Sequence, residues 1–272
     1  MEGKQNGLCL LVAIVLECLF LCASQISAGD KMVENNSDKL SLGGFLISQQ
    51  DRSCLVSPNQ TFSAGFYEVG DNAYAFGVWY THTANLTVVW TANRDQPVNG
   101  RDSRLDLQTD GNLLLYDANG RTVWETHTAG NDLNVKEAVL LETGNLVLLN
   151  SSGGSVWESF KFPTDTLLPH QPLIGNSQLV SRLGTDPITS GYYRLYFDNY
   201  NFLHLMFQTS YVVSNYWPSV YDGLSGFNLS RYAVLDEFGG FKSSDNFSFA
   251  AWDYGLNLKR RLTLDPDGNL RL

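Results

Sequence analysis

Short runs in which apolar and polar residues alternate follow one another along the chain, separated by clusters of Gly, Asn, Asp and Ser. Alternation with a period of two is typical of β-strands that bury one face, and the clusters between the runs are typical of turns. No long stretch repeats its apolar residues at helical spacing. We therefore expect an all-β protein.

Residues 105–115 show this pattern most clearly. The dipeptide Asp110-Gly111 lies between two apolar runs, which is a strong sequence signal for a β-hairpin. The flanking apolar positions are Leu105, Leu107, Leu113 and Leu115. They share one parity along the chain, so they are predicted to face a core together.

The opposite parity of the same hairpin is mostly polar. It carries Gln108, Asp110, Asn112, Leu114 and Tyr116. Two amides, a carboxylate and a phenol around one apolar side chain supply donors and acceptors at fixed spacing, which suits a polyhydroxylated ligand. The alternative is that Asp-Gly-Asn serves only to form the turn.

The turn recurs at 142–148 and at 267–272, and Gly-Asn-Leu is common to all three copies. That shared part is expected to be scaffold. In the second copy Leu141 and Leu149 replace Gln108 and Tyr116, and the carboxylate of Asp110 is lost. Only the first copy combines the scaffold with the full polar set, which favours a binding site there.

A second repeat places a tryptophan after valine in three units. Trp124 and Trp157 are 33 residues apart, and Trp90 precedes Trp124 by 34. This spacing predicts three small sheets around a common axis, with the indoles filling the centre. The tryptophans could instead be platforms on which sugars stack, but regular spacing favours the core.

The segment Gln108-x-Asp110-x-Asn112-x-Leu114-x-Tyr116 is similar to the mannose-binding motif of the bulb-type (monocot mannose-binding) lectins, with leucine where that family usually has valine. The resemblance implies a β-prism II fold of three four-stranded sheets with pseudo-threefold symmetry. It also implies that Asp110 and Asn112 bind the region of the axial 2-hydroxyl of mannose. Gln108 and Tyr116 would bind hydroxyls further round the ring, and Leu114 would pack against its carbon face.

Two further segments, 88–98 with Asn93-Arg94-Asp95 and 157–169, resemble plant S-domain (G-type lectin) receptor-like proteins. Residues 214–218 and 261–272 resemble the second, degenerate lectin-like module of those proteins. Relatives usually continue with EGF-like and PAN-type modules, a membrane span and a Ser/Thr kinase. The chain thus looks like the start of such an ectodomain, from a truncated product or an incomplete gene model.

This resemblance divides the chain into residues 1–28 (signal peptide), 29–44 (lead-in), 45–164 (bulb-type lectin domain) and 165–272 (truncated second lectin-like domain). Pro163, Pro169 and Pro172 near the boundary are expected to stop strand pairing. The implied function is the binding of mannose-type glycans in cell-surface recognition or signalling. The alternative is an ectodomain that binds a protein, a peptide or another receptor, with the lectin fold as scaffold.

The amino-terminal segment resembles a secretory signal, with Lys4 before the mostly apolar run 8–23 and small residues after it. An uncleaved anchor is the alternative. Six Asn-x-Ser/Thr motifs follow, which predict an exported glycoprotein. They begin at Asn35, Asn59, Asn85, Asn150, Asn228 and Asn246. The protein is thus expected outside the cell, or on the outer side of the plasma membrane as part of a receptor.

The net charge of −10 becomes −9 after loss of residues 1–28, which contain Glu2, Lys4 and Glu17. An acidic chain argues against nucleic acids or anionic membranes as partners. Cys54 is then the one remaining cysteine, so packing rather than disulfides must stabilise the fold.

The sequence predicts no cofactor or metal site. The four histidines, His82, His127, His170 and His204, lack metal-ligand spacing. A pair of glycosidase carboxylates stays open from sequence alone, because such a pair meets only in the folded structure. We expect a binding protein rather than an enzyme, with no kinase domain in this chain.

Overall fold

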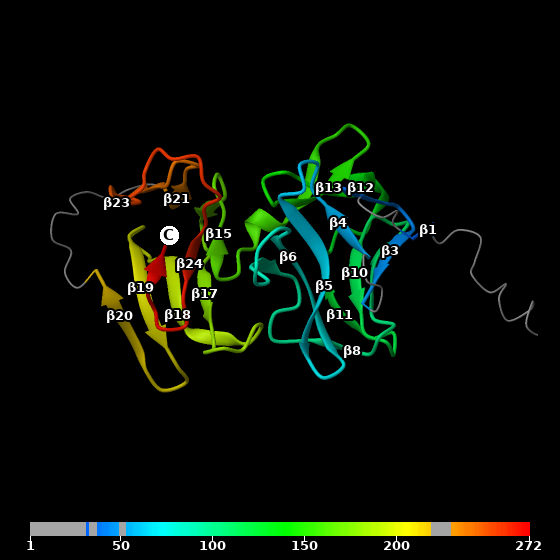
Figure 1. The fold of residues 1–272 in the computed structure, drawn as a ribbon, viewed down its shortest axis with the longest axis horizontal. Helices are drawn as coiled ribbons and strands as arrows, with labels where there is room; N and C mark the ends of the chain where they lie inside the picture. Colours follow the sequence, from blue (N-terminus) through cyan, green and yellow to red (C-terminus); the bar gives the residue numbers. More distant parts are fainter. Residues whose placement is uncertain (1–30, 33–36, 49–52, 219–229) are drawn as a thin grey trace, which may run out of the picture.

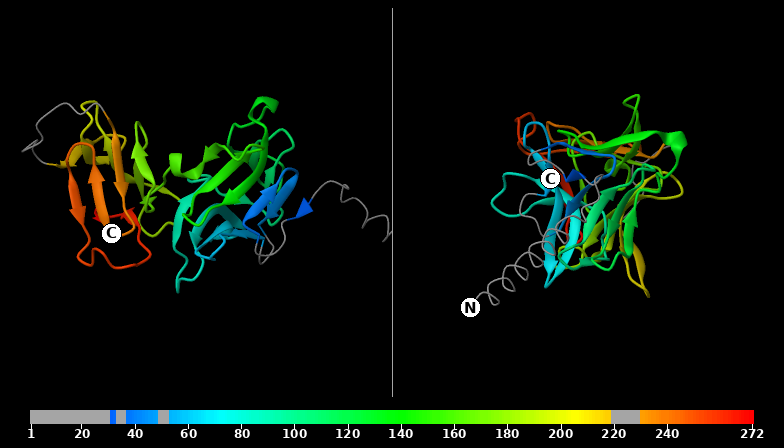
Figure 2. Two further views of the ribbon diagram at one scale, coloured as in Figure 1. Left: turned by 90° about the horizontal axis from the view of Figure 1, so that it is seen from above. Right: turned by 90° about the vertical axis from the view of Figure 1, so that its right-hand side faces the viewer.

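The computed structural model describes residues 31–32, 37–48, 53–218 and 230–272. Figure 1 shows two β-rich lobes, the first on the right and the second on the left, and the view from above in Figure 2 shows the same two lobes. The helical segments of the described residues are two short 3₁₀ helices, η1 (Asn131–Leu133) and η2 (Ser159–Lys161). The prediction of an all-β protein is confirmed. In these ranges no helix is long and apolar enough to cross a membrane.

Three sheets form the first lobe. The first sheet contains, in spatial order, β1 (Lys31–Met32), β3 (Gly44–Ile47), β9 (Arg104–Leu107), β10 (Leu113–Tyr116) and β11 (Thr122–Glu125). The second contains β14 (Ser155–Glu158), β13 (Leu146–Asn150), β12 (Val135–Leu140) and β2 (Lys39–Ser41). The third contains β4 (Cys54–Val56), β5 (Phe62–Gly70), β6 (Ala73–Tyr80) and β7 (Val88–Thr91), and β8 (Val98–Asn99) also pairs with β6. The predicted prism of three four-stranded sheets is confirmed, with β1 and β8 as additions.

The inward faces of these sheets share one hydrophobic core. The four hairpin leucines predicted to face it are at most 1% exposed (Leu105, Leu107, Leu113 and Leu115). They pack with residues from the other two sheets, among them Phe76 of β6 and Leu148 of β13. Alternation along each strand therefore determines which residues reach the core and which face outwards.

The centre of the first lobe is occupied by three tryptophans. Trp90, Trp124 and Trp157 lie on the last strands of the three sheets, β7, β11 and β14. Their ring centroids are 5.6–6.0 Å apart in all three pairs, with interplanar angles of 65–76°. This is edge-to-face packing, in which the positive edge of one ring meets the negative face of the next. The prediction that the indoles fill the centre is confirmed.

The second lobe also contains three sheets. One consists of β15 (Thr166–Leu167), β24 (Leu262–Leu264) and β25 (Leu270–Arg271). Another consists of β16 (Pro172–Ile174), β21 (Tyr232–Leu235), β22 (Gly240–Ser243) and β23 (Ser248–Ala250). The last consists of β17 (Leu179–Arg182), β18 (Ser190–Phe197), β19 (Leu203–Gln208) and β20 (Val213–Trp217). They enclose a core of their own, in which Leu195, Phe241 and Leu264 are fully buried.

The expectation that Pro172 stops strand pairing is wrong. Pro172 begins β16 and is the register partner of Val234 in β21. The strand β16 lies at the edge of its sheet. At an edge, the nitrogen of a proline can face away from the neighbouring strand, so its missing N–H removes no bond from the ladder.

The Asn93-Arg94-Asp95 segment connects the lobes. Asn93 stays within the first lobe, where its Oδ1 accepts from the Phe76 N–H at 2.9 Å. The Arg94 guanidinium donates to the carbonyls of two β17 residues, Val180 at 2.6 Å and Ser181 at 2.5 Å. The Asp95 carboxylate accepts from the N–H and the hydroxyl of Ser190, both at 2.6 Å. Burial lowers the pKa of Arg94. Each residue of the segment therefore has a distinct structural task.

Four of the predicted glycosylation motifs fall on described residues. Asn59, Asn85 and Asn246 are exposed and Asn150 is half-buried. Asn35, Asn228 and the predicted signal segment 1–28 lie outside the described residues.

The tryptophan cluster gives a stability prediction. Trp157 is 6% exposed, and Trp157→Ala should lower the free energy of unfolding by about 3–5 kcal/mol because it empties the middle of the core. Urea unfolding followed by circular dichroism measures the change. Trp252→Ala is the control, since the side chain of Trp252 is fully exposed and its removal should change stability by less than about 0.5 kcal/mol. A stable Trp157→Ala variant that had lost sugar binding would instead identify Trp157 as a stacking platform.

The contacts between the lobes give a second prediction. Arg94→Leu leaves two carbonyls of β17 without their charged donor, and each such bond contributes about 1.5–3 kcal/mol. We expect the two lobes to unfold in separate thermal transitions and residues 163–172 to be cleaved faster by protease. Arg101→Leu should change neither the thermal unfolding nor the rate of cleavage, because the Arg101 side chain is exposed and makes no bond within the described structure. A single unshifted transition for Arg94→Leu would show that Arg94 does not hold the lobes together.

Candidate functional site

The polar hairpin predicted from the sequence is formed by the turn between β9 and β10. The Gln108 N–H donates to the Asn112 carbonyl at 2.8 Å, and the Gly111 N–H donates to the Gln108 carbonyl at 3.0 Å. Gly111 has φ of 90°, and a Cβ atom there would lie 2.9 Å from Cβ of Val135. Only glycine fits this position without strain. The turn therefore places Asp110 at its exposed tip.

One carboxylate oxygen of Asp110 closes the turn, since Oδ1 accepts from the Asn112 N–H at 3.0 Å. Among the described residues its Oδ2 has no protein partner. An exposed carboxylate oxygen in this position can accept hydrogen bonds from a ligand, and charge-assisted bonds of this kind are stronger than neutral ones. The turn thus fixes Asp110 without using up its acceptor capacity.

Asn112 is buried, at 5% exposure, and its amide is fixed on both sides. Its Nδ2 donates to Oε2 of Glu125 at 2.7 Å, while Oδ1 accepts from the Thr126 hydroxyl at 3.0 Å and the Thr128 N–H at 3.1 Å. The second copy repeats this arrangement, since Asn145 donates to Glu158 at 3.1 Å. These side-chain bonds of the asparagine are therefore part of the scaffold in both copies. An amide nitrogen has two N–H groups, and within the described structure one of those of Asn112 is not used.

The remaining predicted site residues lie on the outward face of the same sheet. Leu114 and Tyr116 are half-buried and alternate along β10 with the buried Leu113 and Leu115. Gln108 is half-buried at the start of the turn. The structure therefore brings all five predicted residues together on one face, with Asn112 beneath it (Gln108, Asp110, Asn112, Leu114 and Tyr116; hereafter the polar patch).

Neighbouring strands add charged residues that the sequence analysis missed. Asp106 and Glu125 are the register partners of Leu114, and Arg104 is the partner of Tyr116. Arg104 pairs with Asp106 at 2.6 Å, and the Gln108 amide donates to Asp106 at 3.5 Å. Burial, followed by the negative charge of Asp106, raises the pKa of Tyr116, so its hydroxyl is available as a donor.

The positions of Asp106 and Arg104 beside the patch can be predicted from the sequence. Once the turn is centred on Asp110, so that Gln108 lies opposite Asn112, antiparallel register places position 106 opposite 114 and position 104 opposite 116. Glu125 could not be placed in this way, because its position depends on how β11 pairs with β10.

The other two copies of the turn offer no free carboxylate at the position of Asp110. In the second copy the Thr143 hydroxyl takes the role of Asp110, accepting from the Asn145 N–H at 3.4 Å. In the third copy Arg271 lies over the turn between β24 and β25 and pairs with Asp265 at 2.5 Å and Asp267 at 2.6 Å. These bonds to Arg271 hold the pKa of Asp267 well below its usual range. The acceptors of the third copy are therefore already occupied by the protein.

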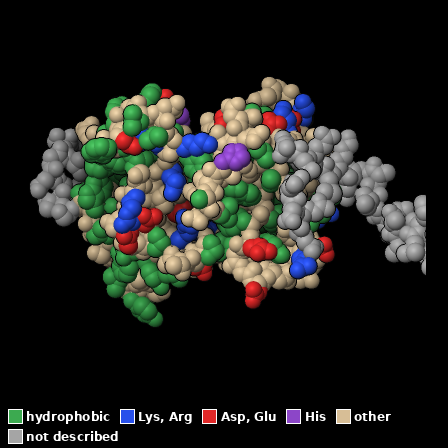
Figure 3. Space-filling view, viewed as in Figure 1, with side chains coloured by type: hydrophobic (Ala, Val, Ile, Leu, Met, Phe, Trp, Pro, Cys, Tyr) green, Lys and Arg blue, Asp and Glu red, His purple; other side chains and the backbone are tan. Residues whose placement is uncertain are grey.

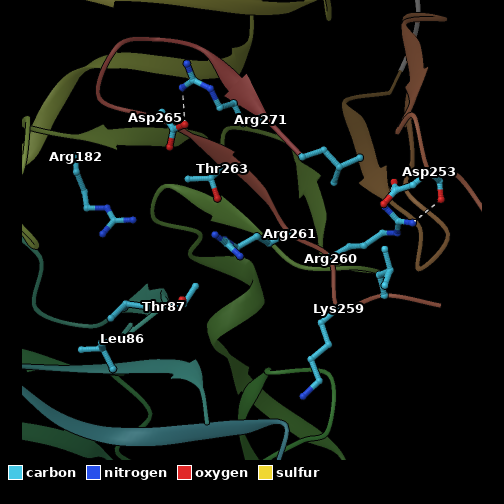
Figure 4. Close-up of a pocket in the computed structure, with 13 residues that line it drawn as sticks. Leu86, Thr87, Arg182, Asp253, Lys259, Arg260, Arg261, Thr263, Asp265 and Arg271 are labelled. Carbon is cyan, nitrogen blue, oxygen red and sulfur yellow. Dashed lines mark hydrogen bonds and ion pairs between the residues drawn. The ribbon is translucent and has the colours of Figure 1, made fainter. Parts of the chain in front are cut away.

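The described structure also contains a hollow that no residue of the polar patch lines. It has a volume of about 530 Å³, lies between the lobes and is lined by several basic side chains. Figure 4 shows Arg182 and Arg261 on its walls, with Arg271 paired to Asp265 above them. The described residues contain no group of three His, Cys, Asp or Glu placed to hold a metal ion.

Comparison with known proteins identifies a domain within the chain and relatives that are similar to it. A sequence profile described as D-mannose binding lectin matches residues 87–183, which include the whole polar patch. A putative receptor protein kinase of Zea mays is 44% identical over 252 residues, covering 88% of this chain and 30% of the relative. A G-type lectin S-receptor-like serine/threonine-protein kinase of Arabidopsis thaliana is 31% identical, covering 86% of this chain and 30% of the relative. The chain therefore contains a D-mannose binding (bulb-type) lectin domain.

More specifically, its relatives are G-type lectin S-receptor-like kinases, and the chain spans about a third of their length. Solved structures with a similar fold include the mannose-specific agglutinin of snowdrop bulbs (Galanthus nivalis) in complex with methyl-α-D-mannoside. It is 21% identical, with 42% of this chain and 91% of that chain covered and a TM-score of 0.32. A lectin of Marasmius oreades is 24% identical, with 47% of this chain and 95% of that chain covered and a TM-score of 0.36. The identification of the lectin domain rests on the sequence matches.

The repeated asparagine gives a prediction that separates scaffold from site. Asn112→Ala and Asn145→Ala each remove the amide donor to a half-buried carboxylate and leave buried donors without their acceptor, so both should lower the free energy of unfolding by about 1–3 kcal/mol. Tyr116→Phe should leave it nearly unchanged, because the Tyr116 hydroxyl has no protein partner in the described part of the chain. Urea unfolding measures all three variants. A large loss for Asn112→Ala alone would show that the two copies are not equivalent scaffolds.

Proposed function

We propose that the polar patch binds mannose-type glycans. The observation that carries this proposal is the exposed, half-used carboxylate of Asp110 beside the fixed amide of Asn112. The second copy of the turn has no carboxylate at this position, and the third has its carboxylate paired with Arg271. A ligand with neighbouring hydroxyls can donate to Asp110 and accept from Asn112 at once. The match of the D-mannose binding lectin profile over this segment supports the same ligand class.

The roles of the side chains follow from their positions and from the family motif. Asp110 accepts from sugar hydroxyls, and Asn112 donates through its unused N–H near the axial 2-hydroxyl. Gln108 and Tyr116 lie further along the same face and bind hydroxyls round the ring. Leu114 provides an apolar surface for the carbon face of the sugar.

The patch is shallow, so its affinity for one sugar should be low. A few hydrogen bonds with little apolar enclosure correspond to a dissociation constant of about 1 mM, near −4 kcal/mol. Useful strength then requires several sites that meet a branched or clustered glycan.

We place this binding outside the cell, in the ectodomain of a receptor-like kinase involved in cell-surface recognition or signalling. Exposed Asn59, Asn85 and Asn246 are compatible with glycosylation in the secretory pathway. The relatives that cover most of this chain are named receptor kinases.

The test is retention of the deglycosylated protein on immobilised mannose, with free mannose and free galactose as competitors. Asp110→Asn removes the charge while keeping an oxygen that can accept the Asn112 N–H, so it should abolish retention and leave the fold intact. Asp267→Asn is the matched control, because Asp267 occupies the same turn position in the second lobe and is already paired with Arg271.

We expect Asp267→Asn to be retained like the parent, and only mannose to elute the parent. If the folded parent is not retained at all, or if galactose elutes it equally well, the proposal of a mannose site fails.

A second candidate function is the binding of a protein or peptide. The space-filling view in Figure 3 shows apolar side chains gathered on the second lobe. The fully exposed Trp252 belongs to a loop with exposed Tyr254 and Leu256. Buried Arg260 holds this loop from beneath, since it donates to Asp253 Oδ1 at 2.7 Å and to the Leu256 carbonyl at 3.2 Å. An ordered, exposed apolar loop is typical of a protein contact. If the mannose test fails, we propose protein or peptide binding as the function instead.

A further inference from the structure

A cleft between the two lobes lies next to the polar patch and has no role in the function proposed above. Its volume is about 310 Å³, at the lower end of the range of about 300–1,000 Å³ usual for ligand sites. The first lobe contributes the accessible edges of the three core tryptophans, together with Phe162 and Pro163. The second lobe contributes Val180 and Ser190, which are held in place by Arg94 and Asp95.

Phe162 provides a fixed aromatic surface in this cleft. Its ring stacks on Trp157 with centroids 5.7 Å apart and an angle of 12°, yet 56% of the residue is exposed. Its carbonyl accepts from Nε1 of Trp90 at 2.9 Å, which fixes the backbone as well. A large apolar ring that stays open to solvent while held from behind is suited to stacking against the C–H face of a sugar.

Glu125 connects the cleft to the polar patch. It lines the cleft, and its Oε2 is the acceptor of the Asn112 amide at 2.7 Å. Its Oε1 lies 3.5 Å from Nδ1 of His127, and 80% of the His127 side chain is exposed. Thr126 likewise lines the cleft and donates to Asn112. A ligand that extends from Asn112 past β11 therefore enters the cleft.

We infer that this cleft is a second sugar subsite, so that the ligand is a neutral oligosaccharide of at least two residues. One mannose-type residue lies on the polar patch and the next stacks on Phe162, with Glu125 and His127 contacting the hydroxyls between them. This inference rests on the proposed function. An acidic sugar is disfavoured, because Glu125 lies between the two subsites and the cationic group of Arg94 is occupied by backbone carbonyls.

The experiment is isothermal titration of the deglycosylated protein with methyl-α-D-mannoside and, separately, with a linear mannotriose. The parent should bind mannotriose about tenfold more tightly, since one good stacking contact contributes about that factor. Phe162→Ala should remove this gain and leave the affinity for methyl-α-D-mannoside unchanged. The main-chain carbonyl that binds Trp90 is retained in this variant.

Two further variants keep the test sharp. Phe238→Ala is the matched control, because Phe238 is also exposed, at 44%, but lies in a turn of the second lobe. It should keep the full preference for mannotriose. His127→Asn removes an imidazole at a residue with φ of 55°, a conformation that asparagine tolerates, and it should lower the affinity for mannotriose alone.

The possible failures are distinguishable. If the parent binds both sugars equally, the subsite is excluded and the mannose patch stands. If Phe162→Ala weakens both sugars equally while its unfolding curve is unchanged, Phe162 acts on the patch and the subsite is again excluded. If the parent binds neither sugar, the proposed function fails and the subsite fails with it. If Phe162→Ala does not fold, the His127→Asn titration decides, and an unchanged preference for mannotriose excludes the subsite.

Discussion

The edge-to-face contact of three tryptophans is the interaction on which the first lobe depends. Each of its sheets is too small to bury its own apolar face, and each ends in a strand that carries one indole to the common axis. The three rings therefore fix the angles between the sheets as well as filling the centre. Because no disulfide is available to Cys54 within the described residues, aromatic packing has to provide this constraint.

The position of the polar patch follows from the same constraint. With Trp124 directed to the axis, its neighbour Glu125 must face outwards, opposite Leu114. Glu125 then fixes the side-chain amide of Asn112, and the backbone N–H of Asn112 donates to Oδ1 of Asp110. The packing of the Trp124 indole is thus linked to the exposed Asp110 carboxylate through Glu125 and Asn112.

The sequence was sufficient for features that depend on local periodicity. The inward leucines of the β9–β10 hairpin, the central tryptophans and the outward patch all follow from strand parity and repeat spacing. The sequence was insufficient for residues whose contacts lie in a distant part of the chain. Arg94 and Asp95 were noticed only as part of a family motif, and their bonds to β17 and Ser190 depend on how two lobes meet. Pro172 was misjudged because edge position, which decides whether proline is tolerated, is a property of the whole sheet.

A patch that binds sugars must keep its polar groups hydrated rather than bonded to one another. Direct ion pairs within the patch would have to break before a neutral hydroxyl could replace them, and a hydroxyl is the weaker partner. The third copy of the turn illustrates this cost, since Arg271 supplies both Asp265 and Asp267 with charged donors. In the first copy the cation of the same face, Arg104, pairs instead with Asp106 on its own strand, β9. The Asp106 carboxylate therefore keeps Arg104 engaged away from Asp110, and this separation of charges leaves the carboxylate of the first turn open to a ligand, unlike that of the third.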